Sequence, residues 1–288
     1  MTTLPRLLLL DGHAIAYRAF FAIRSLSTKS GLATNAVYGF IRMTDQLFQQ
    51  WRPSHICAVF DGGLPDERMA LLPSYKAQRE EMPADLDAQF PLIHEYLAAA
   101  GIADVQIERE EADDIIATQA VFAKQSGEVL LATSDKDLFQ LVDERVAIIP
   151  PTKSDQRMGP EDVEKKTGVR PQQIAEWLAL IGDSADNIPG VPGIGPKTAA
   201  KLLNQFGTLD SLYKNLVQVE REKLRLALAE HEDAVRRNLQ MTTLRTNLDV
   251  PLDWPLWTVR PNHQDLLSFY RKMEFSSMAK ALEAPELF

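Results

Sequence analysis

The 288-residue sequence contains very little cysteine and no long apolar segment. Its single cysteine, Cys57, cannot form a disulfide within the chain, which excludes a disulfide-stabilised scaffold and indicates a reducing compartment. The leucine run Leu7–Leu10 stops at an aspartate and is far shorter than the roughly 20 apolar residues that cross a bilayer. We therefore predict a cytoplasmic protein without a signal peptide or a membrane partner.

The motifs of several common enzyme classes are also missing. The sequence has no HExxH metalloprotease motif and no GxSxG nucleophile motif, and its five histidines are scattered. The segment Gly190–Thr198 comes close to a phosphate-binding loop, but Pro196 separates Gly195 from Lys197 and the required spacing fails. Zinc protease, serine hydrolase and phosphate-loop chemistries are therefore poorly supported.

The composition that remains is that of an ordinary globular protein, with 45% hydrophobic and 25% charged residues. The length allows one large domain or two smaller ones. Because the formal charge is −9, the composition at first argues against a nucleic-acid partner.

The first half of the chain alternates short apolar runs with segments of helical periodicity, and a proline-containing excursion over residues 62–83 interrupts the alternation. Strands are predicted at Leu7–Leu10, Ile56–Phe60 and Val129–Ala132, and helices at Val37–Trp51, Leu86–Ala100 and Ala112–Lys124. This order predicts an α/β fold with a mostly parallel central sheet flanked by helices.

Helical patterns dominate the second half. They cover Pro171–Ile181, Pro196–Phe206 and Glu220–Thr242, and Pro150–Pro151 marks a hinge before them. We expect an α/β core over residues 1–155 and a helical region over residues 156–288.

Acidic residues gather where the predicted strands end. Asp11 and Asp61 each follow a strand directly, and Asp135 and Asp137 follow the third. In open parallel sheets, ligands bind beyond the carboxyl ends of the strands, so these acids can converge. Two more clusters, EEADD and GDSADN, add Glu111, Asp113, Asp114, Asp183 and Asp186. Helix capping and a solvated turn are the alternative explanations of these two clusters.

Nine converging carboxylates would repel one another strongly unless cations neutralised them. Ligand sets made only of oxygen suit Mg²⁺ or Mn²⁺ and do not suit zinc. Two such ions about 4 Å apart can hold the attacking and the leaving oxygen of a phosphodiester. Since these nine acids equal the whole excess of −9, the acidic composition does not exclude a nucleic-acid substrate.

A glycine-rich hairpin and two basic groups complete the pattern. Over residues 187–207, three glycines precede a helix that begins at Pro196 and carries two lysines, namely Gly190, Gly193, Gly195, Lys197 and Lys201. This pattern indicates a helix-hairpin-helix that binds DNA backbone, with an ordinary helical turn as the alternative. The basic groups are Tyr17 and Arg18 beyond Asp11, and Lys76 and Arg79 in the excursion, which suit a threaded single strand.

These segments together resemble the 5′-nuclease, or flap endonuclease, family, and in particular the 5′→3′ exonuclease domain of bacterial DNA polymerase I. The resemblance extends from about Leu7 to Leu282. It rests on the motifs LLDGHAIAYRAFFA, TNAVYGF, AVFD, YKAQREEMP, EADD, TSDKDLFQLV, GDSADNIPGVPGIGPKTAAKLL and EFSSMAKAL.

The resemblance implies a role for each group of residues. A first metal site would comprise Asp11, Asp61, Glu111 and Asp113, and a second would comprise Asp135, Asp137, Asp183 and Asp186, with Asp114 as an additional acid. Lys76 and Arg79 would lie in a helical arch, about residues 62–86, and neutralise the scissile phosphate, while Tyr17 and Arg18 would hold the substrate strand. The hairpin would grip duplex DNA, and its carbonyl groups would also hold K⁺.

The implied activity is structure-specific 5′→3′ exonuclease and 5′-flap endonuclease cleavage of DNA, leaving 5′-phosphate products. The substrates would be flaps, nicks and 5′ ends, including RNA-primed ends in replication and repair, and the protein would act as a monomer. Two alternatives remain open, namely a non-catalytic module that binds branched DNA and a single-strand RNA nuclease of a related fold. The length fits either a free-standing nuclease or a domain of a longer polymerase.

Overall fold

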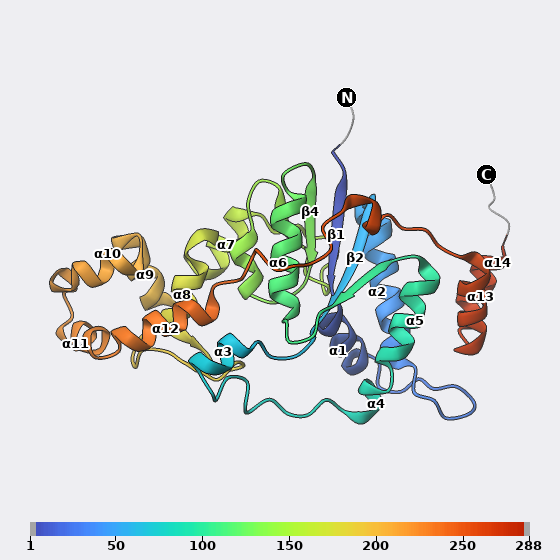
Figure 1. Cartoon of the computed structure of the whole chain (residues 1–288), viewed down its shortest axis with the longest axis horizontal. Helices are drawn as coiled ribbons and strands as arrows, with labels where there is room; N and C mark the ends of the chain where they lie inside the picture. The colour runs from blue at the N-terminus through green and yellow to red at the C-terminus, as the bar shows by residue number, and fades with distance from the viewer. Residues whose placement is uncertain (1–3, 285–288) are drawn as a thin grey trace.

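The computed structural model describes residues 4–284 of the chain. At its centre lies a five-stranded parallel sheet with the strand order β3-β2-β1-β4-β5 (Figure 1). The strands are β1 (Arg6–Asp11), β2 (His55–Phe60), β3 (Ala103–Gln106), β4 (Glu128–Ala132) and β5 (Val146–Ile148). Strand β1 is buried on both faces, which explains its unbroken leucines: Leu7 and Leu9 pack into one hydrophobic cluster, and Leu8 and Leu10 pack into the other.

Helices cover both faces of the sheet. One cluster contains side chains from α1 (Gly12–Ala22), α2 (Asn35–Trp51) and α5 (Phe90–Ala100), and the other contains side chains from α6 (Ala112–Ala123), η1 (Asp137–Leu141) and α8 (Ile174–Ile181). The last two helices, α13 (His263–Lys272) and α14 (Ser276–Glu283), return to the first half of the chain, where α13 packs beside α5 (Figure 1). The mostly parallel α/β sheet predicted from the sequence is therefore confirmed.

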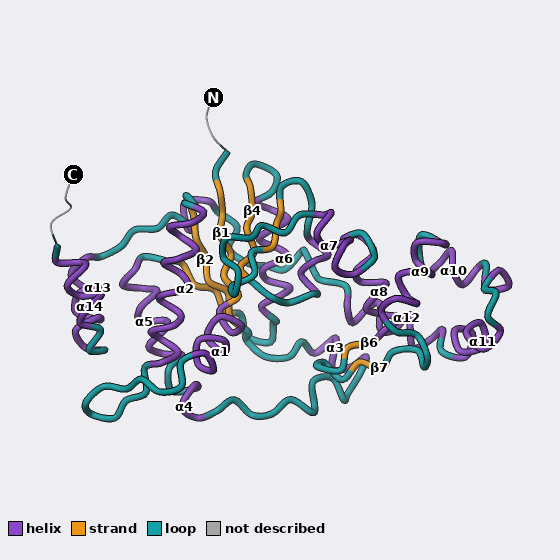
Figure 2. The backbone as a smooth tube through the Cα atoms, turned by 180° about the vertical axis from the view of Figure 1, so that it is seen from behind, coloured by secondary structure: helices purple, strands orange, loops and turns teal. Residues whose placement is uncertain are grey.

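Most of the remaining helices extend to one side of the sheet (Figure 1). They are α7 (Pro160–Thr167), η2 (Pro171–Gln173), α9 (Pro196–Phe206), α10 (Leu209–Lys214), η3 (Leu216–Gln218), α11 (Glu222–Glu230) and α12 (Glu232–Thr242). A short antiparallel pair, β6 (Gly182–Asp183) and β7 (Ile188–Pro189), follows α8 and lies near α3 (Asp66–Leu71), as Figure 2 shows. After α12 the chain runs back through η4 (Trp254–Trp257), and Thr258 forms a bridge with His55 of β2.

Two predicted helices are interrupted in the structure. The segment Leu86–Ala100 divides into α4 (Ala84–Asp87) and α5, because Pro91 starts a new helix at its second position. The segment Glu220–Thr242 divides into α11 and α12 at His231. The division of the chain between residues 155 and 156 stays a prediction. Helix α13, from the second part, packs against α5 of the first part.

The excursion is much less helical than the arch that the family resemblance implied. Only α3 is helical in its first part, and Leu72 ends this helix because it precedes Pro73. Lys76 then adopts the left-handed conformation, with φ of 55°. We call residues 72–83 the crossing segment. Among the described residues, no helix is long and apolar enough to span a membrane.

Candidate active site

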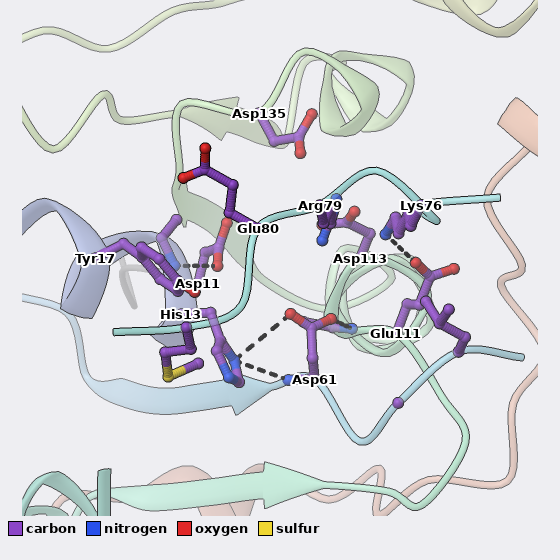
Figure 3. A pocket seen from close by; sticks show the side chains of 15 residues that line it. Asp11, His13, Tyr17, Asp61, Lys76, Arg79, Glu80, Glu111, Asp113 and Asp135 are labelled. Atoms are coloured by element: carbon purple, nitrogen blue, oxygen red, sulfur yellow. Dashed lines mark hydrogen bonds and ion pairs between the residues drawn. The ribbon is translucent and has the colours of Figure 1, made fainter. Parts of the chain in front are cut away.

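Six carboxylates line one open pocket at the carboxyl ends of the parallel strands (Figure 3). They are the predicted Asp11, Asp61, Glu111, Asp113 and Asp135, together with Glu80 of the crossing segment. We call this the acid pocket. The five predicted acids come from three strand ends and from the start of α6, so the predicted convergence of acids from distant parts of the sequence is present in the fold.

Hydrogen bonds orient the two acids at the ends of β1 and β2. Asp11 caps α1, where its Oδ1 accepts from the Ala14 N–H at 3.0 Å, and its Oδ2 accepts from the Thr133 hydroxyl at 2.9 Å. Asp61 Oδ1 accepts from the Ala112 N–H at 2.9 Å, which ties the end of β2 to the first turn of α6. Both carboxylates are thus held in place by the elements that follow neighbouring strands.

A second group of acids lies where η1 meets the β6–β7 pair. One carboxylate oxygen from each of Asp137, Asp183 and Asp186 lies within 4.8 Å of the other two. The β6–β7 turn brings Asp183 and Asp186 together. The acids of both groups influence one another, since Asp137 and Asp11 each raise the pKa of Asp113.

Burial and like charge make this cluster unfavourable in its fully ionised form. Burial raises the pKa of Asp11 to about 7, against the hydrogen bonds from Ala14 and Thr133. Burial, and then the neighbouring Asp135, raises the pKa of both Asp113 and Asp137 well above the usual value. Asp137 Oδ1 is also buried without a hydrogen-bond partner among the described residues. An orphaned oxygen within an all-carboxylate set fits a hard divalent cation.

Asp114 differs from the other eight acids. It is fully buried and does not line the acid pocket, and its oxygens accept from Arg68 Nη2 at 3.0 Å and Arg245 Nη2 at 2.8 Å. Two arginines disfavour a cation at this carboxylate. This geometry does not support the expected metal role, and we reassign Asp114 to an ion pair that joins α6 to the excursion and to the segment after α12.

Glu111 contacts both the acid pocket and the arginine-rich surroundings of Asp114. It forms ion pairs with Arg68 and Lys76, and it accepts a hydrogen bond from the Tyr75 hydroxyl at 3.0 Å. Burial alone would raise the pKa of Glu111, but Lys76 and Arg68 outweigh burial and hold the pKa below its usual value. The Glu111 carboxylate is therefore charged. Both Glu111 and its partner Lys76 line the acid pocket.

The crossing segment places its basic side chains over the acids (Figure 3). In addition to the Lys76–Glu111 pair, Arg79 Nη2 lies 2.8 Å from Asp186 Oδ1. The backbone is attached as well, since the Lys76 N–H donates to the Asp186 carbonyl at 3.0 Å. Lys76 and Arg79 do not share a helix face, yet both reach the acids because turns fold the segment back on the β6–β7 pair.

Of the two residues predicted beside Asp11, Tyr17 lines the acid pocket, whereas Arg18 is exposed and does not line it. This placement does not bring Arg18 into the site. His13, which the sequence analysis treated as one of several scattered histidines, does line the pocket. Its position two residues after Asp11, in the first turn of α1, was the signal that could have identified it.

His13 supports the second strand end. Its Nδ1 accepts from the Asp61 N–H at 3.1 Å, and its ring packs on Phe90 with 4.6 Å between centroids. Burial lowers the pKa of His13, so the neutral ring suits this acceptor role. Thr133, also unidentified from the sequence, positions Asp11 in a comparable way.

The glycine hairpin joins α8 to α9, beyond the β6–β7 pair. Gly193 has a φ of 82° and Gly195 caps α9, and a Cβ at either position would meet no atom within 4 Å. Gly190 has a packing role instead, because a Cβ there would lie 2.1 Å from the Ile181 carbonyl oxygen. Lys197 and Lys201 are exposed on α9 and line a groove of their own, not the acid pocket.

Two family models match the chain almost from end to end. Residues 6–168 match "5'-3' exonuclease, N-terminal resolvase-like domain", and residues 169–265 match "5'-3' exonuclease, C-terminal SAM fold". A 5'-3' exonuclease of Aquifex aeolicus is 39% identical over 279 residues, which are 96% of this chain and 95% of that protein. DNA polymerase I of Bacillus caldotenax is 37% identical over 287 residues, which are 97% of this chain and 32% of that protein. The chain thus spans about a third of the length of the polymerases it matches.

Solved structures show the same fold. A T5 5'-exonuclease with zinc bound has a TM-score of 0.70 at 24% identity, covering 84% of this chain and 90% of that one. The catalytic core of Rad2 in complex with DNA substrate has a TM-score of 0.65 at 18% identity, covering 97% of this chain and 91% of that one.

Replacing Asp113 by Asn should stabilise the protein in a chelator, because it removes one of the repelling carboxylates. The pKa of Asp113 in the folded protein lies well above 3.8, so its charge penalises the fold only as the pH rises above that value. The gain in Tm should therefore be larger at about pH 8 than at about pH 4. Added Mg²⁺ should raise the Tm of the wild type more than that of Asp113→Asn, as thermal-shift measurements would show.

The matched control is Asp114→Asn, which alters the adjacent acid. It leaves Arg68 and Arg245 without their shared partner, so it should lower the stability by about 3–5 kcal/mol with or without Mg²⁺. The rise in Tm on adding Mg²⁺ should stay at the wild-type value. A loss of that rise in Asp114→Asn would contradict the reassignment.

Proposed function

The chain belongs to the 5'-3' exonuclease family, and from this premise we propose that it is a structure-specific 5′-nuclease that hydrolyses phosphodiester bonds of DNA. We propose 5′ flaps, nicks and 5′ ends as substrates, including the RNA-primed ends that arise in replication and repair. The products would carry 5′-phosphates, and the protein would act as a monomer.

The observation that carries this proposal is the meeting of acids from the two halves of the chain. Asp11, Asp113 and Asp135 belong to the sheet edge, while Asp183 and Asp186 arrive on the β6–β7 turn that leads into the glycine hairpin. The segment that we propose to grip duplex is therefore covalently continuous with part of the proposed reaction centre. This connection supports cleavage at a fixed distance from a duplex end.

Two divalent ions are proposed as cofactors, Mg²⁺ with Mn²⁺ as a substitute. One group of ligands would be Asp11, Asp61, Glu111 and Asp113, and the other would be Asp135, Asp137, Asp183 and Asp186. When bound, such ions supply a hydrolytic water at neutral pH and neutralise charge on the leaving oxygen. The raised pKa values and the orphaned Asp137 oxygen support a cation in this position.

The chain's own residues bind and orient the substrate. Lys76 and Arg79 already lie at the edge of the acids, and we propose that they turn from Glu111 and Asp186 to the scissile phosphate. Tyr17 lines the same pocket and offers a ring to the adjacent nucleotide. His13 and Thr133 hold Asp61 and Asp11 in place.

The hairpin is proposed to bind the duplex without reading its sequence. The open space over Gly193 and Gly195 lets a phosphate backbone approach the start of α9, and Lys197 and Lys201 follow on the exposed surface. We also propose K⁺ at the hairpin carbonyls, as the family resemblance implies.

The Asp183→Ala variant tests the metal role. In the presence of Mg²⁺, it should cut a 5′-flap DNA more than about a hundredfold slower than the wild type, since loss of a group that merely supports a metal ligand already costs roughly 10–100-fold. Its affinity for the flap should change little. The control is Asp249→Ala, which removes an exposed carboxylate outside both acid groups. Wild-type cutting by Asp183→Ala would contradict the metal assignment, and a wild type that binds flaps without cutting would favour a branched-DNA-binding module.

Changes in the crossing segment should separate chemistry from binding. Lys76→Ala or Arg79→Ala should slow single-turnover cutting by roughly 10²–10³-fold, because a charge directed at the reacting phosphate acts mainly in the transition state. The affinity for duplex should fall far less. If the two variants lost only affinity, the residues would belong to a general DNA-binding surface.

Changes in the hairpin should have the opposite profile. Gly193→Leu should block the approach of the backbone, and Lys197→Ala should lower the slope of log affinity against log salt by about one unit. Cutting of a short single strand, which has no duplex to grip, should be nearly unchanged. Equal losses on flap and single-strand substrates would instead assign the hairpin to the support of the fold.

A further inference from the structure

A second pocket lies beside the acid pocket, between the loop that follows β4 and α7. Its floor is apolar and includes the buried side chains of Phe139 and Ile148. Lys153, Lys165 and Lys166 line it and are exposed. We call it the lysine pocket.

The positive charge of this pocket is not balanced by the chain itself. Within residues 4–284, none of the three lysines has a carboxylate within ion-pair distance, and Lys166 Nζ instead lies 4.9 Å from the centre of the Phe139 ring. The one carboxylate that lines the pocket, Asp162, accepts from the Gly159 N–H at 3.0 Å and serves the start of α7. Ser134 and Thr152 add hydroxyl donors. Three free ammonium groups with nearby hydroxyls form a donor set for a polyanion.

The lysine pocket shares a wall with the acid pocket. Ser134 lines the former, and the next residue, Asp135, lines the latter. Thr133 connects the two, since its hydroxyl donates to Asp11 at 2.9 Å and accepts from the Asp135 N–H at 3.0 Å, while the residue itself lines the lysine pocket. A ligand in the lysine pocket therefore lies next to the candidate reaction centre.

The other side of the lysine pocket adjoins the hairpin. Helix α7, which carries Lys165 and Lys166, is capped at its C-terminus by Gly168, and the Gly168 carbonyl accepts from Asn204 Nδ2 of α9 at 2.9 Å. The lysine pocket thus occupies the part of the fold between the acids and the helix that follows the glycine hairpin.

We propose that the lysine pocket binds backbone phosphates of the nucleic acid next to the scissile phosphate, on the side toward the hairpin. This inference rests on the proposed nuclease function and adds a subsite to it. Ammonium groups and hydroxyls hold phosphates without selecting bases, so the subsite fixes the register of the cut and does not read sequence.

The first test measures how salt changes the binding of a labelled 5′-flap DNA in a chelator, where no cutting occurs. Lys153→Ala, Lys165→Ala and Lys166→Ala should each lower the salt slope by about one unit. The matched control is Lys280→Ala, an exposed lysine of α14 outside both pockets, which should leave the slope unchanged. Lys165→Arg keeps the charge and should restore the wild-type slope. Unchanged slopes in all three pocket variants would overturn the proposal.

The second test locates the contact on the DNA. Methylphosphonate linkages, which lack the phosphate charge, are placed one at a time within a few nucleotides of the cleavage site. At one linkage the wild type should lose affinity, and Lys165→Ala should be insensitive to the same replacement, because the partner is already absent. Additive losses at every linkage would overturn the proposal even if the wild type cuts flaps normally. Failure of the nuclease function would be seen separately, as a wild type that does not cut with Mg²⁺.

Discussion

Mutual repulsion among buried carboxylates is the constraint on which the rest of this structure depends. Asp113, for example, lies near enough to Asp135, Asp11 and Asp137 for each of these acids to raise its pKa. The fold brings these acids together at a real cost in free energy, because charge is disfavoured in buried sites. Basic side chains of the crossing segment offset part of this cost, because Lys76 pairs with Glu111 and Arg79 pairs with Asp186. Divalent cations bound among the acids would offset the remaining repulsion.

The same constraint explains why the two halves of the chain are interlocked. The β6–β7 turn delivers Asp183 and Asp186 to the sheet edge, and the chain then continues into the glycine hairpin. Asn238 of α12 braces this turn, since its Nδ2 donates to the carbonyls of Ala179 and Pro189. Movement of the hairpin would therefore disturb the acids. This continuity supports the proposed coupling between duplex binding at the hairpin and cleavage at the acids.

The sequence alone predicted the sheet and the meeting of most acids, because both follow from local rules. Leu7–Leu10 reads as a strand buried on both faces, and an acid after a parallel strand must lie at the common edge. Contacts that depend on tertiary packing were not predictable. The sequence does not distinguish Asp114 from its neighbour Asp113. In the fold, the side chain of Asp114 pairs with Arg245, which lies 131 residues further along the chain. Helix α3 ends before Pro73, and Lys76 in the crossing segment adopts the left-handed conformation. The lysine pocket combines residues from η1, β5, α7 and the neighbouring loops.

Anomalous diffraction from crystals soaked in Mn²⁺ tests the central claim most directly, because it locates the cations themselves. We predict one peak among Asp11, Asp61, Glu111 and Asp113 and a second among Asp135, Asp137, Asp183 and Asp186, with Lys76 and Arg79 displaced from the acids. Asp114 should remain paired with Arg68 and Arg245. Crystals that show no manganese at either acidic group, or an ion bound at Asp114, would contradict the account.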